Sequence, residues 1–151
     1  MVPAHSVEFV VAWTEVQHQV RPRQGVWTVK KNIRLTLEGG NVISEATSAT
    51  NASGKTVGFS SEGKLRERMT RGQNQTTWRV QDERTLVRTR ETPDHIEVMQ
   101  LTVTDPNGCR ASLSYQLKPG ISEIMLRSIR NGEPLYFSSI SVENMTCKAS
   151  E

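Results

Sequence analysis

The stretch WTVKKNIRLTL, residues 27–37, alternates between apolar and polar residues more cleanly than any other part of this chain. Successive side chains of a β-strand point to opposite faces, so this alternation places Trp27, Val29, Ile33, Leu35 and Leu37 on one face. We expect that face to meet a hydrophobic core and the other face to meet water. The stretch therefore predicts a half-buried strand of an antiparallel sheet.

Turn signals divide the rest of the chain into segments of similar length. Gly, Pro, Asn and Asp favour tight turns, and the runs between them alternate in polarity, which is typical of successive hairpins. The expected turns are Glu38–Asn41, Asn51–Gly54, Ser61–Gly63, Arg71–Asn74, Pro93–Asp94 and Asp105–Gly108. The further expected strands are Val42–Ala49, Lys55–Ser60, Lys64–Thr70, Thr76–Gln81, Arg84–Glu91, His95–Thr104, Cys109–Leu117 and Leu135–Cys147.

These elements predict one all-β domain over residues 1–151. A chain of 151 residues is long enough to bury a sizeable core. Many evenly spaced strands favour a single antiparallel sheet that either closes into an up-and-down barrel or folds over as a two-layer sandwich. Closure is attractive because it removes exposed strand edges.

Two segments depart from the simple alternation. In Ser6–Val20, apolar residues occupy alternate positions up to Trp13 and then resume on the opposite face at Val16. This change of face predicts a β-bulge inside a long strand. In residues 121–130, the apolar residues follow a helical spacing, and Asn131-Gly132 after them suits either a helix end or a hairpin turn. We favour a short helix there, because it would let the last strand run antiparallel to Cys109–Leu117.

The expected order of hairpin strands, a helix and a final strand resembles the lipocalin and calycin barrels in architecture only. Gly25-Val26-Trp27 and Thr104-Asp105-Pro106 echo two short lipocalin motifs. The resemblance implies a barrel that holds a small apolar ligand at its mouth.

Composition limits the classes of function. The mean hydropathy is −0.51 and the apolar runs are short, so we expect no transmembrane segment. The net charge of +3 permits an anionic partner without demanding one.

The two cysteines, Cys109 and Cys147, fit neither a zinc pattern nor a C-x-x-C motif. Cys109 follows a turn and Cys147 lies near the carboxyl end, where a disulfide would hold a terminal strand in place. A disulfide predicts an extracytoplasmic protein, periplasmic or secreted, although residues 1–5 do not read as a signal peptide.

Catalytic chemistry has little support in the sequence. His5, His18 and His95 are its three histidines, and no nucleophile elbow, zinc-protease motif or phosphate-binding loop is present. His95 and Glu97 share a strand face, but no second half of a zinc-deaminase signature follows. We therefore expect a non-enzymatic protein with no catalytic residues, no cofactor and no metal site.

Basic residues concentrate between residues 64 and 90. Same-face spacing on extended strands predicts an anion-binding surface, for which the candidate residues are Arg66, Arg68, Arg88 and Arg90. Trp78 would offer a stacking plane suited to single-stranded nucleic acid. The plainer interpretation is the solvated face of a sheet, where charge prevents edge-to-edge aggregation.

Aromatic and apolar residues suggest an alternative site inside the sheet. If the strands enclose a cavity, we expect Trp27, Leu35, Leu113 and Tyr115 to line it. The sequence thus predicts an exported, non-enzymatic binding module for a small apolar ligand. The alternatives are a module that binds nucleic acid, polysaccharide or anionic lipid through residues 64–90, and a structural or protein-interaction domain.

Overall fold

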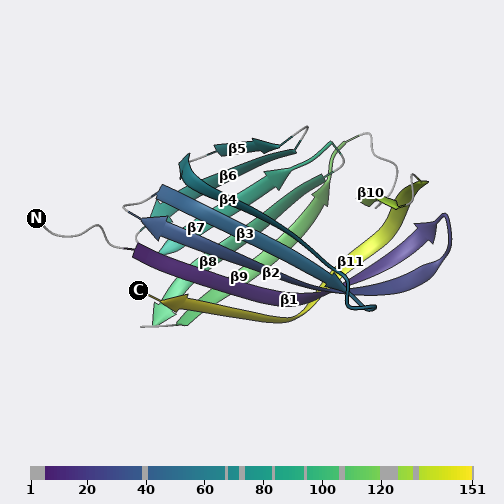
Figure 1. Ribbon diagram of the computed structural model, residues 1–151, viewed down its shortest axis with the longest axis horizontal. Coiled ribbons are helices and arrows are strands. Elements are labelled where there is room, and N and C mark those ends of the chain that lie inside the picture. Colours follow the sequence, from purple (N-terminus) through teal and green to yellow (C-terminus); the bar gives the residue numbers. More distant parts are fainter. Residues whose placement is uncertain are drawn as a thin grey trace, which may run out of the picture.

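The computed structural model describes residues 6–38, 41–66, 68–71, 74–82, 84–93, 95–105, 108–119, 126–130 and 133–150. These residues form one antiparallel sheet of eleven strands (Figure 1), which confirms the all-β prediction. The strands are β1 (Ser6–Arg21), β2 (Gly25–Glu38), β3 (Asn41–Asn51), β4 (Thr56–Arg66), β5 (Arg68–Arg71), β6 (Asn74–Asp82), β7 (Thr85–Glu91), β8 (His95–Asp105), β9 (Gly108–Leu117), β10 (Leu126–Arg130) and β11 (Glu133–Ser150).

The order of strands across the sheet is β4-β3-β2-β1-β11-β9-β8-β7-β6-β5, and β10 pairs with β11 off this path. Two runs of hairpins, β1 to β4 and β6 to β9, are therefore joined through β11, which lies between the first strand of one run and the last strand of the other. In Figure 1 the two runs cross each other at an angle, because the sheet curls into a half-barrel.

The curl follows from the connection between β4 and β5. These strands stand at opposite ends of the strand order, yet β4 ends at Arg66 and β5 begins at Arg68. Since consecutive Cα atoms are only about 3.8 Å apart, the two edges of the sheet must meet at this corner. A strand that leaves one part of a sheet and enters another is the usual way to make such a corner.

The turn expected at Ser61–Gly63 is wrong. Because β4 continues through these residues, the chain changes direction after Arg66 instead. Ser61 and Glu62 pair with Glu45 and Ser44 of β3, so β4 continues through them. The register between β3 and β4 then shifts by extra residues in β4 before Arg66. A bulge of this kind bends the strand without ending it.

The alternation on β2 is confirmed in its central part. Ile33 and Leu35 are fully buried, whereas Arg34 between them is exposed. Phe9 and Val11 of β1 are buried beside them, and Leu86 and the other buried apolar side chains of the second hairpin run complete the core. The remaining members of this core cluster are Trp13, Val42, Trp78, Met99, Leu101 and Ala149.

The bulge predicted at the parity slip between Trp13 and Val16 of β1 is wrong. The pairing of β1 with β2 runs without a shift from Ser6 to Gln19, and the inward face continues from Trp13 to Glu15, which is buried. In the pairing with β11, an extra residue lies on β1 between Gln19 and Arg21, and extra residues lie on β11 opposite His18–Gln19 and opposite Ala12–Thr14. Asn144, in this part of β11, has a φ of 53°, a left-handed conformation that asparagine tolerates well.

The helix expected in residues 121–130 is also wrong where the structure describes that segment. Residues 126–130 form β10, which pairs with β11 from Leu126↔Phe137 to Arg130↔Glu133. Asn131-Gly132 stands between these paired ends in the sequence, a dipeptide that favours two-residue hairpins. Residues 121–125 lie outside the described residues.

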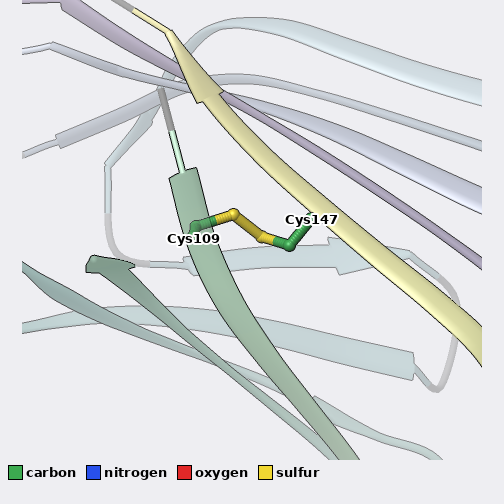
Figure 2. Close-up of a disulfide and its surroundings, with 2 residues drawn as sticks. All are labelled: Cys109 and Cys147. Carbon is green, nitrogen blue, oxygen red and sulfur yellow. A yellow bond between two sulfur atoms is a disulfide. The ribbon is translucent and has the colours of Figure 1, made fainter. Parts of the chain in front are cut away.

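The seam between β9 and β11 is the weakest part of the ladder. Lys148↔Gly108 is the one backbone pair described there, and the neighbouring positions are Cys147 and Cys109. Figure 2 shows these two cysteines joined across the gap between the strands, with Cα atoms 5.3 Å apart. This distance is typical of a disulfide, so the predicted pairing is confirmed.

We predict that the disulfide Cys109–Cys147 forms in the purified protein and stabilises it. It closes a loop of 38 residues, for which the chain-entropy relation gives about 4 kcal/mol. The double variant Cys109→Ser/Cys147→Ser should lower the urea midpoint accordingly. Mass spectrometry after alkylation without reductant checks the bond, and two alkylated thiols in protein prepared under oxidising conditions would contradict it.

Candidate functional site

The interior of the half-barrel holds polar and charged side chains beside its apolar core. On several strands, the inward side chain that follows the apolar core is charged or carries a hydroxyl group. These inward residues are Glu15 on β1, Lys31 on β2, Glu45 on β3, Arg88 on β7, Glu97 on β8 and Tyr115 on β9. We call them the polar layer.

Glu15 is the centre of the first half of this layer. Its carboxylate accepts hydrogen bonds from Gln17 at 2.7 Å and from the Tyr115 hydroxyl, and it forms an ion pair with Lys31 at 2.9 Å. Trp13 points its indole N–H at the same carboxylate at 3.5 Å. Burial raises the pKa of Glu15, but the Lys31 charge and these hydrogen bonds outweigh burial and hold the pKa below its usual value.

Arg88 is the centre of the second half. Its Nε and Nη2 donate to the two carboxylate oxygens of Glu45, and its Nη1 donates to Glu97 at 3.1 Å. The indole N–H of Trp78 donates to Glu45 at 3.2 Å. Burial lowers the pKa of Arg88, yet its two carboxylate partners reverse this effect and raise the pKa above its usual value, so the guanidinium stays charged.

Tyr115 connects the two halves. Burial and the nearby charges of Glu97 and Glu15 raise the pKa of its hydroxyl well above the ordinary value, since a phenolate there would be desolvated and repelled. The hydroxyl therefore remains protonated and donates to Glu15. The His95 ring lies 6.1 Å from the Tyr115 ring, at the end of the layer where β8 begins.

The polar layer is fully satisfied by the protein itself. Among the described residues, no buried side-chain nitrogen or oxygen atom lacks a hydrogen-bond partner. An unpaired buried polar group costs about 1–3 kcal/mol, so complete pairing is what allows these charges to remain inside. The side chains of the polar layer are therefore held in fixed positions.

A cavity of about 300 Å³ borders the polar layer, a size at the lower end of small-molecule sites. Its walls come from both hairpin runs and combine apolar and polar side chains. The apolar part of the described lining is Trp13, Ile33, Ala49 and Val57, and the polar part is Lys31, Asn32, Glu45, Thr47, Ser48, Asn74, Thr76, Arg88, Arg90 and Glu97.

The residues expected to line a cavity lie elsewhere or take another role. Trp27 lies on the part of β2 that extends beyond β3, and its side chain is 39% exposed. Leu35 is fully buried in the core, and Leu113 is half-buried against that core. Tyr115 is inside the polar layer, where it binds Glu15. The described cavity lining contains none of these four residues.

Of the four arginines expected to bind anions, the structure describes the side chains of Arg88 and Arg90. Arg88 is buried and bound by two carboxylates, whereas Arg90 is half-buried and lines the cavity. Arg66 and Arg68 belong to β4 and β5, but their side chains lie outside the described residues. Trp78 is buried and binds Glu45, so its indole is not a stacking surface for a polymer.

Sequence reasoning missed Glu15, Glu45 and Lys31, and it considered Glu97 only as part of an incomplete zinc-deaminase signature. A signal was available, because each occupies the inward parity of its strand: Lys31 lies between Val29 and Ile33, and Glu15 follows Trp13. On a single strand, a charged residue at an inward position looks like a break in the apolar alternation. Repeated on several strands, it indicates a buried ionic layer.

The part of the chain that the structure describes contains no group of three or more His, Cys, Asp or Glu residues placed to hold a metal ion. No helix there has the length and hydropathy needed to cross a membrane.

Comparison with known proteins gives no relative from which to argue: no protein-family model, no curated protein and no solved structure matches this chain.

We predict that Arg88→Met destabilises the fold by about 3–5 kcal/mol, because it leaves the buried carboxylates of Glu45 and Glu97 without their cation. The matched control Arg79→Met, at an exposed position on β6, should change stability by no more than about 0.5 kcal/mol. Urea unfolding measures both. Equal stability of the two variants would show that the ion pairs do not hold the layer together.

We also predict that the stabilising effect of Glu15 depends on pH. Because its pKa is lowered in the folded state, its contribution is present above the ordinary glutamate pKa and is lost as the pH falls through the folded-state value. Glu15→Gln should therefore cost about 1–3 kcal/mol at neutral pH, and this difference from the wild type should shrink below about pH 4.3. A pH series of urea unfolding, with the exposed Glu143→Gln as control, measures the difference, and a cost independent of pH would contradict the assignment.

Proposed function

We propose that this protein is an exported, non-enzymatic binding module whose half-barrel holds a small ligand with apolar surface in the cavity beside the polar layer. The observation that carries this proposal is the cavity itself, which has Trp13, Ile33 and Val57 in its wall. Ligand sites in proteins are typically concave and apolar, with a few fixed polar groups that orient the ligand.

The rigidity of the polar layer supports a preformed site. Lys31, Arg88 and Glu97 line the cavity and are each held by ion pairs to other interior side chains. A ligand that enters therefore meets side chains that are already ordered, which lowers the entropic cost of binding. The small side chain of Ala49 on β3 leaves space on the facing wall.

The disulfide supports the exported location. Cys109 and Cys147 form a bond that persists in oxidising compartments and is rare in the cytosol. The bond also secures the seam between β9 and β11, so the half-barrel would depend on an oxidising environment to keep its shape.

A neutral apolar probe tests the proposal. We predict that decanol binds saturably, raises the melting temperature with increasing concentration and changes the fluorescence of Trp13, since a ligand of the native state must stabilise it. Trp13→Phe should remove most of the fluorescence change. If neither decanol nor an anionic molecule with the same apolar chain produces a thermal shift or a fluorescence change, the protein is a structural or interaction domain and the proposal is wrong.

A pair of variants on one strand locates the ligand. Ala49→Phe would place a ring into the cavity and should weaken decanol binding at least about tenfold, because it occupies the ligand's space. Ala46→Phe is the control: Ala46 is opposite the exposed Arg34 of β2 and does not belong to the described cavity lining. Equal weakening by both variants would place the ligand elsewhere.

A further inference from the structure

The charged side chains that line the cavity differ in exposure. Glu45, Arg88 and Glu97 are well buried, with 5%, 7% and 12% of their side chains exposed. Two other cations of the lining are more exposed: the Lys31 side chain is 29% exposed and Arg90 is half-buried.

Arg90 differs from Arg88 and Lys31 in having no ion-pair partner among the described residues. It follows Arg88 at the next inward position of β7, and its backbone pairs with that of Glu97 on β8. The Glu97 carboxylate, however, accepts a hydrogen bond from Arg88. Among the described residues, no carboxylate lies within ion-pair distance of Arg90, whereas Arg88 has two and Lys31 has one.

The Arg90 guanidinium offers five N–H donors in a planar arrangement that suits carboxylate and phosphate oxygens. The same cavity that contains Arg90 has Trp13, Ile33 and Val57 in its wall. One cavity thus combines an unpaired cation with an apolar surface. This combination fits a molecule with an anionic head group and an apolar tail.

We propose that Arg90 binds the anionic head group of an amphiphile, a carboxylate or a phosphate monoester, while the apolar tail of that molecule packs against Trp13, Ile33 and Val57. This inference rests on the proposed function, because it names the ligand class of the same cavity. Lys31 contributes less to binding, since its ammonium group is already held by Glu15 at 2.9 Å.

The test compares decanoate, decyl phosphate and decanol, which share one apolar chain and differ in the head group. Isothermal titration should show that at least one of the two anions binds about tenfold or more tightly than decanol, as expected for charge-assisted hydrogen bonds. Comparing the two anions distinguishes a carboxylate ligand from a phosphate ligand. Their advantage over decanol should decrease at high ionic strength.

Variants of two arginines show which residue causes the preference for anions. Arg90→Gln should abolish the preference for anions, so that decanoate and decyl phosphate bind this variant no more tightly than decanol binds the same variant. The control Arg79→Gln, at an exposed position on the neighbouring strand β6, should retain the preference. Circular dichroism and thermal melts of both variants verify that the fold is retained.

The outcomes separate this inference from the proposed function. If decanol binds as tightly as the anions, or if Arg90→Gln keeps the anion preference, the role of Arg90 is wrong while the binding cavity stands. If none of the three molecules binds, the cavity is not a binding site for amphiphiles and both proposals are wrong.

Discussion

The ion pair between Arg88 and Glu45 is the interaction on which the interior depends. It joins β7 to β3, two strands from different hairpin runs that are not neighbours in the sheet. Removing charges from water is costly, and attraction repays this cost only when the geometry is good and the remaining hydrogen-bonding groups are satisfied. Trp78 and Glu97 satisfy them here. The pair therefore tolerates little displacement of one run against the other.

Two further connections between strands maintain the curl of the sheet. The near-continuity of β4 and β5 brings the two edges together between Arg66 and Arg68. The disulfide Cys109–Cys147 closes the seam where β9 and β11 share one described backbone pair. In a flat sheet with this strand order, β4 could not continue into β5, and Arg88 could not reach Glu45. The half-barrel allows the ion pair, the β4–β5 connection and the disulfide to form together.

The position of the cavity follows from this arrangement. At one end of the half-barrel, the inward side chains are apolar and large, such as Phe9, Leu35 and Leu101, and they pack into a solid core. At the level of the polar layer, the long side chains are drawn toward one another by their ion pairs. Beside them, the small residue Ala49 of β3 leaves the facing wall unfilled. A space with both apolar and cationic surface results, and this mixture supports an amphiphile more strongly than a purely apolar ligand.

Local pattern was sufficient for part of the fold. Alternation over residues 27–37 identified β2 and its buried residues Ile33 and Leu35, because the two-residue period of a strand is a local property. The positions of Cys109 and Cys147, at a turn exit and a chain end, indicated their pairing. Local pattern was insufficient for residues 126–130, since Asn131-Gly132 suits both a helix end and the hairpin that forms.

The sequence by itself determined which residues share a strand face, such as Arg88 with Arg90, and hence that the protein is an antiparallel all-β domain. Only the tertiary structure decided which face is inward and what it meets there. Arg88 and Glu45 are 43 residues apart, and they meet because the sheet curls at the β4–β5 corner. Such long-range contacts depend on the path of the whole chain, so the same alternation of Leu86, Arg88 and Arg90 describes a solvated surface on a flat sheet and the wall of a cavity on a curled one.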